Sequence, residues 1–265
     1  MKKIKQLNLP RIYEGENPKF KKHLGKPKVS HSQISSYKDP QYTNQYILGY
    51  MFKIPQPGNF WATFGSYCGD TLAFRLDKSK AEGRDKEILD NASKYFNEVD
   101  LDTLKKADKL FPKDTVYERE IVLDRGAYVI QGFVDANNMV DCKNVIIDVK
   151  TGGKNSPKKG QKYYGSSDYK QVNLYAKAIE EEGEEIGYCG VVLLDRTFEN
   201  KWSNPETTST FENPILHLSG EIIEIPNPYN RKEAEELLEY MDSVVEEISS
   251  LYETYLKLST LTIEL

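Results

Sequence analysis

The sequence predicts an α/β protein built around one central mixed β-sheet. Helical periodicity fills most of residues 30–110, three strand-like runs follow up to residue 150, and a helix separates these runs from a fourth strand. Apolar residues recur every three or four positions along a helix but alternate along a half-buried strand, so the two patterns can be distinguished. Because a helix between two strands packs on the face of a sheet, this order predicts a sheet flanked by helices.

Each predicted helix has one apolar and one polar face. The helices before the C-terminal one are expected over residues 30–50, 61–76, 81–110 and 168–182. A last, longer helix keeps apolar residues at helical spacing from Leu237 to Tyr255. We expect this last helix to pack on the domain as a brace.

The predicted strands are short runs rich in β-branched and aromatic residues, bounded by turn-forming residues. The first two, "TVYEREIVL" and "AYVIQGFVD", are separated by an Asp-Arg-Gly turn. The third is "NVIIDVK", the fourth is "YCGVVLLD", and the last is "EIIEIP", which precedes the C-terminal helix. Together they supply the strands of the mixed sheet.

Several protein classes are disfavoured by composition. No run approaches the roughly 18 consecutive apolar residues of a membrane helix. The basic N-terminus lacks the apolar stretch and cleavage site of a signal peptide, so we expect a cytoplasmic location, in a bacterial or host cell. Cys68, Cys142 and Cys189 are widely separated, which disfavours a disulfide framework, a zinc site and a cysteine-held iron–sulfur cluster.

Charge is distributed unevenly along the chain, although the formal net charge is only −5. Residues 1–28 carry nine Lys or Arg against two Glu, and the stretch "KTGGKNSPKKGQKYYG" is basic without any acid. Acidic residues gather in "IEEEGEEIG" and in the C-terminal helix. This pattern suits a protein with one basic groove and an acidic opposite surface; solvated surfaces without a partner are the alternative.

Asp135, Asp148 and Lys150 stand inside apolar runs, where charge is costly to bury. Side chains alternate between the faces of a strand, so Asp148 and Lys150 share one face. If the strand of Asp135 is the neighbour, the Cβ atoms of the two aspartates lie about 5 to 8 Å apart, within reach of one shared cation. Such oxygen ligands suit Mg²⁺ or Mn²⁺, and a lysine beside the metal can orient an attacking water and stabilise charge on phosphorus. The set predicts metal-assisted phosphodiester hydrolysis; a plain ion pair on a half-exposed sheet is the alternative.

The surroundings of these residues resemble a known nuclease family. "GFVD", then "DVK", then "QVNLYA" is similar to the pattern G-x-x-D, D/E-x-K and Q-x-x-x-Y of the RecB-like branch of the PD-(D/E)XK nucleases. Upstream, "VSHSQISSYKDPQYTNQYILGY" is similar to the family segment S-x-S-x-[LI]-x-x-[FY]-x-x-C-P-x-x-[FY]-x-x-x-Y. The resemblance covers roughly residues 29–196. It implies a restriction-endonuclease-like core with an N-terminal helical segment.

The resemblance also implies roles for individual residues. Asp135, Asp148 and Val149 are implied metal ligands, and Lys150 is the implied catalytic lysine. Gln171 and Tyr175, which the resemblance adds to the catalytic set, are four positions apart and therefore share one helical face, on the DNA-facing side. The alternative for this last pair is ordinary packing of an amphipathic helix with a polar edge.

Two departures from the family pattern change what is expected. Asp39-Pro40 stands where many relatives have Cys-Pro, so no iron–sulfur cluster is expected. Relatives also have G-x-x-x-H on an early helix, with the histidine near the metal, whereas the fourth residue after Gly65 is Gly69, followed by Asp70. Asp70 is a candidate replacement ligand, and an exposed aspartate is the alternative. Weaker candidates are Glu118, Glu120 and His31.

A basic, glycine-rich loop follows Lys150. Its lysines are expected to contact phosphates, and Tyr163 or Tyr164 to stack on an unpaired base. A flexible solvated linker is the alternative. The expected DNA contacts are Lys154, Lys158, Lys159, Lys162 and Tyr163 of this loop, with Ser32 of the N-terminal segment.

The leading functional hypothesis is a Mg²⁺- or Mn²⁺-dependent DNA nuclease, more an exonuclease than an endonuclease, in recombination, repair or end processing. Single strands or DNA ends are the expected substrate, and a recombination or replication protein is a further expected partner. The alternatives are a catalytically inactive DNA- or protein-binding module on the same fold and a subunit of a larger helicase–nuclease or CRISPR adaptation complex. The expected organisation is a basic arm over 1–28, a nuclease domain over 29–226 and the C-terminal helix over 227–265.

Overall fold

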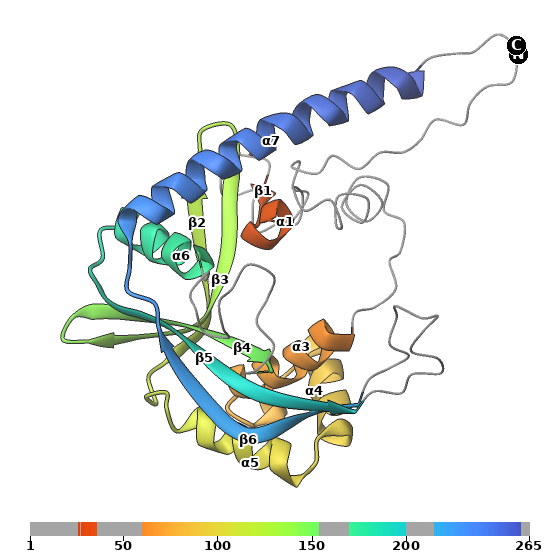
Figure 1. The fold of residues 1–265 in the computed structure, drawn as a ribbon, viewed down its shortest axis with the longest axis vertical. Coiled ribbons are helices and arrows are strands. Elements are labelled where there is room, and N and C mark those ends of the chain that lie inside the picture. The colour runs from red at the N-terminus through yellow and green to blue at the C-terminus, as the bar shows by residue number, and fades with distance from the viewer. Residues whose placement is uncertain (1–25, 27, 36–59, 154–169, 200–214, 261–265) are drawn as a thin grey trace, which may run out of the picture. The chain divides into compact units, whose positions relative to one another are not determined.

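The computed structural model describes residues 26, 28–35, 60–153, 170–199 and 215–260 (Figure 1). These residues fall into two compact units. The first takes in the described parts of residues 1–57, 120–132 and 231–265, and the second those of 58–119 and 133–230. None of the described helices is long and apolar enough to cross a membrane.

The central sheet is mixed, as predicted. Its strands β3 (Val129–Val140), β4 (Lys143–Gly152), β5 (Ile186–Glu199) and β6 (Ile215–Pro226) are neighbours in that order, and β2 (Val116–Asp124) pairs with β3. The β3–β4 and β5–β6 pairs are antiparallel, whereas β4 and β5 are parallel. Asp141 and Cys142 join β3 to β4, and both have positive φ, which a tight two-residue hairpin turn requires. The helix α6 (Lys170–Glu181) lies between β4 and β5 in the chain, as a parallel connection needs.

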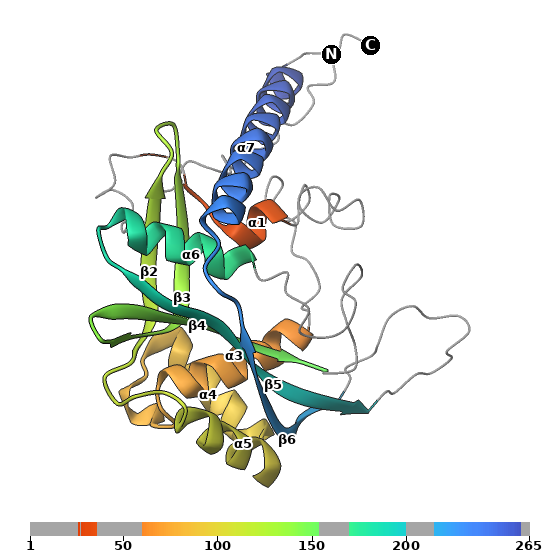
Figure 2. The ribbon, with the colours of Figure 1, turned by 60° about the vertical axis from the view of Figure 1, so that its left-hand side comes forward.

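Helices cover both faces of the sheet in the second unit. The helices α3 (Phe60–Ala73), α4 (Gly83–Tyr95) and α5 (Glu98–Asp108) lie on one side, with the short 3₁₀ helix Lys78–Lys80 between α3 and α4, and α6 lies on the other (Figure 2). Phe64 of α3 and Leu104 of α5 are fully buried in the main core cluster, together with Val192 and Leu194 of β5. The predicted α/β class with flanking helices is confirmed.

The predicted helix over residues 81–110 is wrong in one respect, because the segment forms two helices. Asn97 ends the first helical run by capping the second: its side chain accepts a hydrogen bond from the Asp100 backbone N–H at 2.9 Å. The Asp100 carboxylate accepts one from the Asn97 N–H, also at 2.9 Å. This reciprocal capping box begins α5 and breaks the periodic pattern.

The first unit contains β1 (Lys28–Val29), α1 (His31–Ser35) and α7 (Arg231–Thr260). β1 pairs in parallel with the beginning of β3, Lys28 lying opposite Val129. In α7, Asp242 accepts a hydrogen bond from Tyr128 at 2.6 Å and a paired contact from Arg125. Two elements distant in sequence are thereby joined. The N-terminal helix predicted over 30–50 is described only for its first residues, since 36–59 lie outside the described part.

One polar cluster on the sheet predicts a pH dependence of stability. Arg119 binds Glu184 at 2.7 Å, and Asn144 donates a hydrogen bond to the same carboxylate at 2.9 Å. These hydrogen bonds lower the pKa of Glu184. A carboxylate with a lowered folded-state pKa stabilises the protein above its unfolded pKa, and this contribution is lost as the pH falls through the folded pKa.

We therefore expect Glu184→Gln to destabilise the protein at pH 7, by no more than about 1 kcal/mol because the pair is partly exposed. The difference from the unmodified protein should shrink as the pH falls below about 4. Urea unfolding at pH 7 and pH 3.5 measures it, with the exposed Glu87→Gln as control. A difference that is the same at both pH values would contradict the prediction.

Candidate active site

Asp135, Asp148 and Lys150 are brought together by neighbouring strands, as the sequence predicted. Ala136 of β3 lies opposite Ile147 of β4, so Asp135 and Asp148 occupy the next position on each strand. Alternation then separates the two faces of β4. Ile147 and Val149 pack against the apolar core, whereas Asp148 and Lys150 form an ion pair on the other face.

The contacts among these residues are short. Lys150 Nζ donates to Asp148 Oδ1 at 2.9 Å and lies 2.8 Å from Oδ2. Asp148 is 2% exposed, so its charge depends on this lysine. Asp135 Oδ2 accepts a hydrogen bond from the Val149 backbone N–H at 2.6 Å. The ion pair with Lys150 explains how the charge of Asp148 is balanced. The neighbouring carboxylate of Asp135 has no cation of its own among the described residues.

The electrostatics of the site follow from this crowding. Burial, and next the charge of Asp148, raise the pKa of Asp135 well above its ordinary value, and Lys150 offsets the rise only in part. Burial by itself lowers the pKa of Lys150, but Asp148 and Asp135 outweigh it and raise that pKa. Lys150 is therefore a permanent cation near neutral pH, whereas Asp135 resists ionisation.

A cavity of about 350 Å³ opens over these groups. One side is the face of α3 that carries Gly65 and Gly69, four residues apart, and the other includes Lys150 and Thr151 of β4. A Cβ at Gly69 would meet no atom within 4 Å, and one at Gly65 would touch Thr151 Oγ1 at 3.5 Å. The two glycines therefore widen the space above the strand. The lining is Trp61, Ala62, Gly65, Ser66, Gly69, Asp70, Leu72, Tyr117, Glu118, Asp135, Val149, Lys150 and Thr151.

Gln171 and Tyr175 contact one another on α6. Gln171 Nε2 donates a hydrogen bond to Tyr175 Oη. Tyr175 is 3% exposed, and burial, with the charges of Asp148 and Asp135, raises its pKa. Its hydroxyl therefore stays neutral and lies close enough to the carboxylates to feel their charge.

A family model matches most of the chain. The model of the PD-(D/E)XK nuclease superfamily matches residues 29–254. The chain belongs to the PD-(D/E)XK nuclease superfamily. The three residues at the centre of the site stand on the two strands where the superfamily pattern was matched in the sequence.

Among the solved structures similar to this chain are the following two. One is a Eubacterium rectale protein described as "Putative exonuclease", with 11% identity, a TM-score of 0.48 and 95% of each chain covered. The other is a protein designated SSO0001, with 13% identity, a TM-score of 0.35, and coverage of 85% of this chain and 82% of that one. No curated protein sequence matches the chain.

Asp70 and Glu118 line the same cavity as Asp135 and Lys150. Burial, and next the charge of Asp85, raise the pKa of Asp70. Burial, and next the charge of Asp70, raise the pKa of Glu118, whose φ of 50° places its backbone in the left-handed region, rare for a non-glycine strand residue. Across the described residues, no three His, Cys, Asp or Glu side chains converge closely enough to hold a metal ion by themselves. The role of Asp70 as a ligand stays a prediction.

Other sequence candidates lie elsewhere. The loop residues Lys154, Lys158, Lys159, Lys162, Tyr163 and Tyr164 are outside the described residues, so their contacts stay predictions. Ser32 is exposed on α1 of the first unit, with its hydroxyl 3.2 Å from that of Ser30. Glu120 accepts a hydrogen bond from Gln131 at 2.6 Å, also in the first unit.

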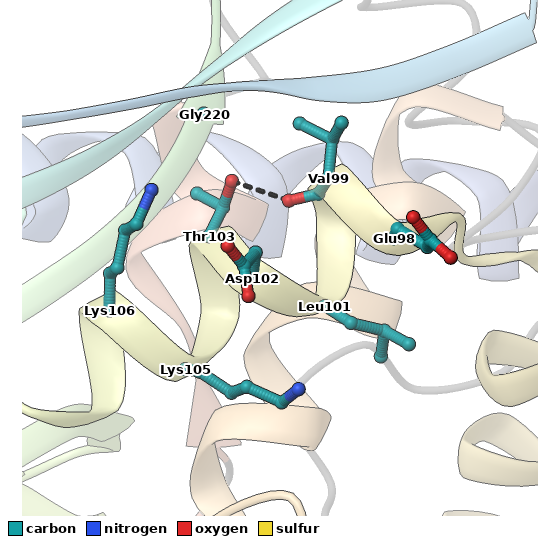
Figure 3. Close-up of a pocket in the computed structure, with 8 residues that line it drawn as sticks. All are labelled: Glu98, Val99, Leu101, Asp102, Thr103, Lys105, Lys106 and Gly220. Atoms are coloured by element: carbon teal, nitrogen blue, oxygen red, sulfur yellow. Dashed lines mark hydrogen bonds between the residues drawn. The ribbon is translucent and has the colours of Figure 1, made fainter.

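A larger cavity, of about 590 Å³, lies along α5, and its lining does not include Asp135, Asp148 or Lys150 (Figure 3). Its lining consists of residues of α5 together with Gly220 of β6. Thr103 donates a hydrogen bond there to the Val99 carbonyl at 2.7 Å, an ordinary contact within a helix. Lys105 and Lys106 stand on this helix beside Glu98 and Asp102, so acids and bases are mixed. We assign the chemistry to the smaller cavity.

One feature of the cavity has no counterpart in the sequence pattern. Trp61 lines the cavity, and the Arg196 guanidinium carbon lies 3.9 Å from its ring centroid. No sequence pattern relates Trp61, on α3, to Arg196, on β5, which comes 135 positions later. Glu118, a weaker candidate from the sequence, also lines the cavity and is an exposed residue of β2.

Proposed function

We propose that this protein is a divalent-metal-dependent DNA nuclease of RecB-like type, an exonuclease that hydrolyses phosphodiester bonds in recombination, repair or end processing. The observation that carries the proposal is the placement of Asp135, Asp148 and Lys150 on neighbouring strands, in and beneath a cavity that α3 leaves open. Two carboxylates beside one permanently charged lysine suit the hydrolysis of an anionic ester. Membership of the superfamily supports the same chemistry.

The residues present fit a divalent cation, which members of the superfamily generally use. The pKa of Asp135 is raised partly by the charge of Asp148, and a bound cation would relieve this repulsion. Asp148 Oδ2 is buried and accepts no hydrogen bond of good geometry from the described residues. Asp135 and Asp148, with the backbone carbonyl of Val149, would supply the oxygen ligands that Mg²⁺ and Mn²⁺ prefer.

The chain's own groups have separate tasks in this mechanism. When bound, the metal ion would neutralise phosphate charge and lower the pKa of a water molecule. Lys150 is too strongly held in its charged form to accept a proton, so it acts as a hydrogen-bond donor to the attacking water or to a phosphate oxygen. Gln171 donates to Tyr175, which fixes the neutral phenol near the carboxylates. Lys150, as a preorganised cation, stabilises the charge that develops on phosphorus.

The activity is tested with end-labelled linear and circular DNA, single- and double-stranded, in Mg²⁺, Mn²⁺ or EDTA. We expect linear DNA to be degraded from its ends in either metal and to survive in EDTA, while circles stay intact. Cutting of circles would replace the exonuclease proposal by an endonuclease. DNA that is bound but never cut in either metal would overturn the catalytic proposal in favour of a binding module on this fold.

Asp135→Asn should have opposite effects on stability with and without metal. An acid whose pKa is raised in the folded state makes the protein less stable as pH rises through and above the unfolded pKa. The pKa of Asp135 is raised, so the variant in EDTA should be more stable than the unmodified protein at pH 8, and this advantage should shrink toward pH 5. Asparagine keeps an oxygen for the Val149 N–H, so packing is preserved.

Thermal unfolding measures both effects. Added Mn²⁺ should raise the Tm of the unmodified protein, because a ligand bound only to the folded state stabilises it, and should leave the Tm of Asp135→Asn almost unchanged. Asp102→Asn, at an exposed aspartate on α5 outside this cavity, is the matched control and should respond to Mn²⁺ as the unmodified protein does. An equal Tm rise in both aspartate variants would remove Asp135 from the metal site.

A further inference from the structure

The first turns of α3 divide their aromatic residues between two environments. Phe60 and Phe64 make edge-on ring contacts with Tyr95, at centroid distances of 5.6 and 6.0 Å, and Phe64 is fully buried. Trp61 is only half-buried: part of its ring packs on the same core and part lines the cavity above Lys150. A tryptophan needed only for the core would gain more from complete burial.

Arg196 holds the indole of Trp61 in place. Its guanidinium carbon lies 3.9 Å from the ring centroid, well within the range of a cation–π contact. Asp195, the preceding residue, lies opposite Gly152 near the end of β4, two positions beyond Lys150. Trp61 and Arg196 therefore lie near the end of β4, beyond Lys150 and at one end of the cavity. A ring fixed in this way loses little conformational freedom when it contacts a ligand.

The glycine face of α3 leads from this tryptophan to the carboxylates. Trp61, Gly65 and Gly69 follow one another at four-residue spacing, so they form one stripe along the helix, and Asp70 comes next. All four line the cavity together with Lys150. A ligand whose phosphate lies at Lys150 therefore has open space along the stripe and an aromatic ring at its end.

The lining of the cavity favours a contact with an uncharged part of such a ligand. Beyond Lys150 its titratable side chains are the acids Asp70, Glu118 and Asp135 and the phenol Tyr117, so the lining offers no second cation to a phosphate group. Lys150 is already paired with Asp148. A nucleobase is uncharged and has a flat aromatic face. Any of the bases can stack on an aromatic side chain, so this contact does not depend on the sequence of the nucleic acid.

We infer that Trp61, held by Arg196, contacts the nucleobase next to the phosphate that reaches Lys150, so that the substrate strand must be unpaired at this point. This inference rests on the proposed nuclease function and specifies its substrate. A cavity of about 350 Å³ is at the small end of ligand sites and admits a nucleotide rather than a base pair. A paired base is stacked within its duplex and reaches such a pocket only after leaving the stack.

The fluorescence of Trp61 tests this inference directly. The chain has two tryptophans, Trp61 and Trp202, so Trp202→Phe leaves Trp61 as the sole indole. In EDTA, which prevents cleavage, oligo(dT) should change the emission of this variant, whereas a blunt hairpin duplex should not. An abasic strand of equal length separates the base from the phosphates and should leave the emission unchanged. An equal change with the abasic strand would overturn the inference.

Affinity for oligo(dT) gives a second measurement. Trp61→Ala should weaken binding about 5- to 100-fold, as expected for loss of one base-stacking contact, and Trp61→Phe should recover most of it. Tyr188→Ala, which removes an exposed aromatic side chain from β5 outside the cavity, is the matched control and should bind like the unmodified protein. Circular dichroism identifies any variant that fails to fold, and the fluorescence measurement needs no change at residue 61.

The inference and the proposed function fail in different ways. Normal cleavage and oligo(dT) binding by folded Trp61→Ala would leave the nuclease proposal intact and overturn the role of the tryptophan. A base-dependent change in Trp61 emission in a protein that never cuts DNA with Mg²⁺ or Mn²⁺ would support the base contact and overturn the nuclease proposal.

Discussion

Lys150→Ala is expected to lower the rate of DNA cleavage by about 10²- to 10³-fold, the usual loss when one preorganised donor to a developing charge is removed. The alanine removes the permanent cation above β4, and no other lysine or arginine among the residues that line the described cavity replaces it. Single-turnover cleavage of a labelled linear strand in Mg²⁺ measures the chemical step. The Mn²⁺-induced rise in Tm should persist, because Asp135 and Asp148 remain.

Two controls separate this catalytic effect from a structural one. Lys143→Ala removes an exposed lysine from the same strand, where it pairs with Glu185 at 3.4 Å, and should cleave normally. Lys150→Arg keeps a positive charge beside Asp148. Compared with Lys150→Ala, it should recover more of the lost stability than of the lost cleavage rate. Since Lys150→Ala leaves a buried carboxylate without its cation, its folding must be checked in EDTA and in Mn²⁺. A folded Lys150→Ala protein that cleaves at more than a tenth of the normal rate would reduce the pair to a structural one.

The centre of the site could be predicted because it depends on local pattern. Asp135 and Asp148 lie on consecutive strands joined by a two-residue turn, so adjacency follows from the alternation of side chains and the shortness of the connection. Lys150 then follows from the same alternation. Gln171 and Tyr175 needed only helical spacing to be placed together, and they do contact one another.

The positions of the residues that form the cavity walls depend on contacts between distant parts of the sequence, which no local pattern predicts. Trp61 meets Arg196 because α3 packs across the sheet, and no local pattern sets that crossing. Likewise β3 continues to Val140, whereas the sequence predicts a strand that ends at Asp135. The prediction is too short because two buried polar residues, Asn137 and Asn138, break the alternation of apolar and polar positions. Asn137 is accommodated because it bonds Arg119 at 2.8 Å and the Val145 carbonyl at 3.1 Å.

Asp100 is the clearest case of a residue whose importance only the fold reveals. It is completely buried, and its carboxylate accepts hydrogen bonds from the Leu218 N–H at 2.6 Å and the Asn97 N–H at 2.9 Å and lies 2.8 Å from His217 Nδ1. In the sequence it is one aspartate of a charged helix, four residues before the buried Leu104. In the structure it joins the beginning of α5 to β6, more than a hundred residues later.

Asp100→Ala should therefore destabilise the protein by about 2 to 4 kcal/mol. The buried Leu218 N–H loses its acceptor, at about 1 to 3 kcal/mol, and α5 loses half of its capping box at the exposed Asn97. The change in urea midpoint at constant m-value measures the loss. Asp102→Ala, an exposed aspartate two residues later on the same helix, should change stability by less than about 0.5 kcal/mol. Equal effects of the two substitutions would show that the Leu218 and Asn97 N–H groups find water or another acceptor, and that the buried carboxylate is dispensable to the fold.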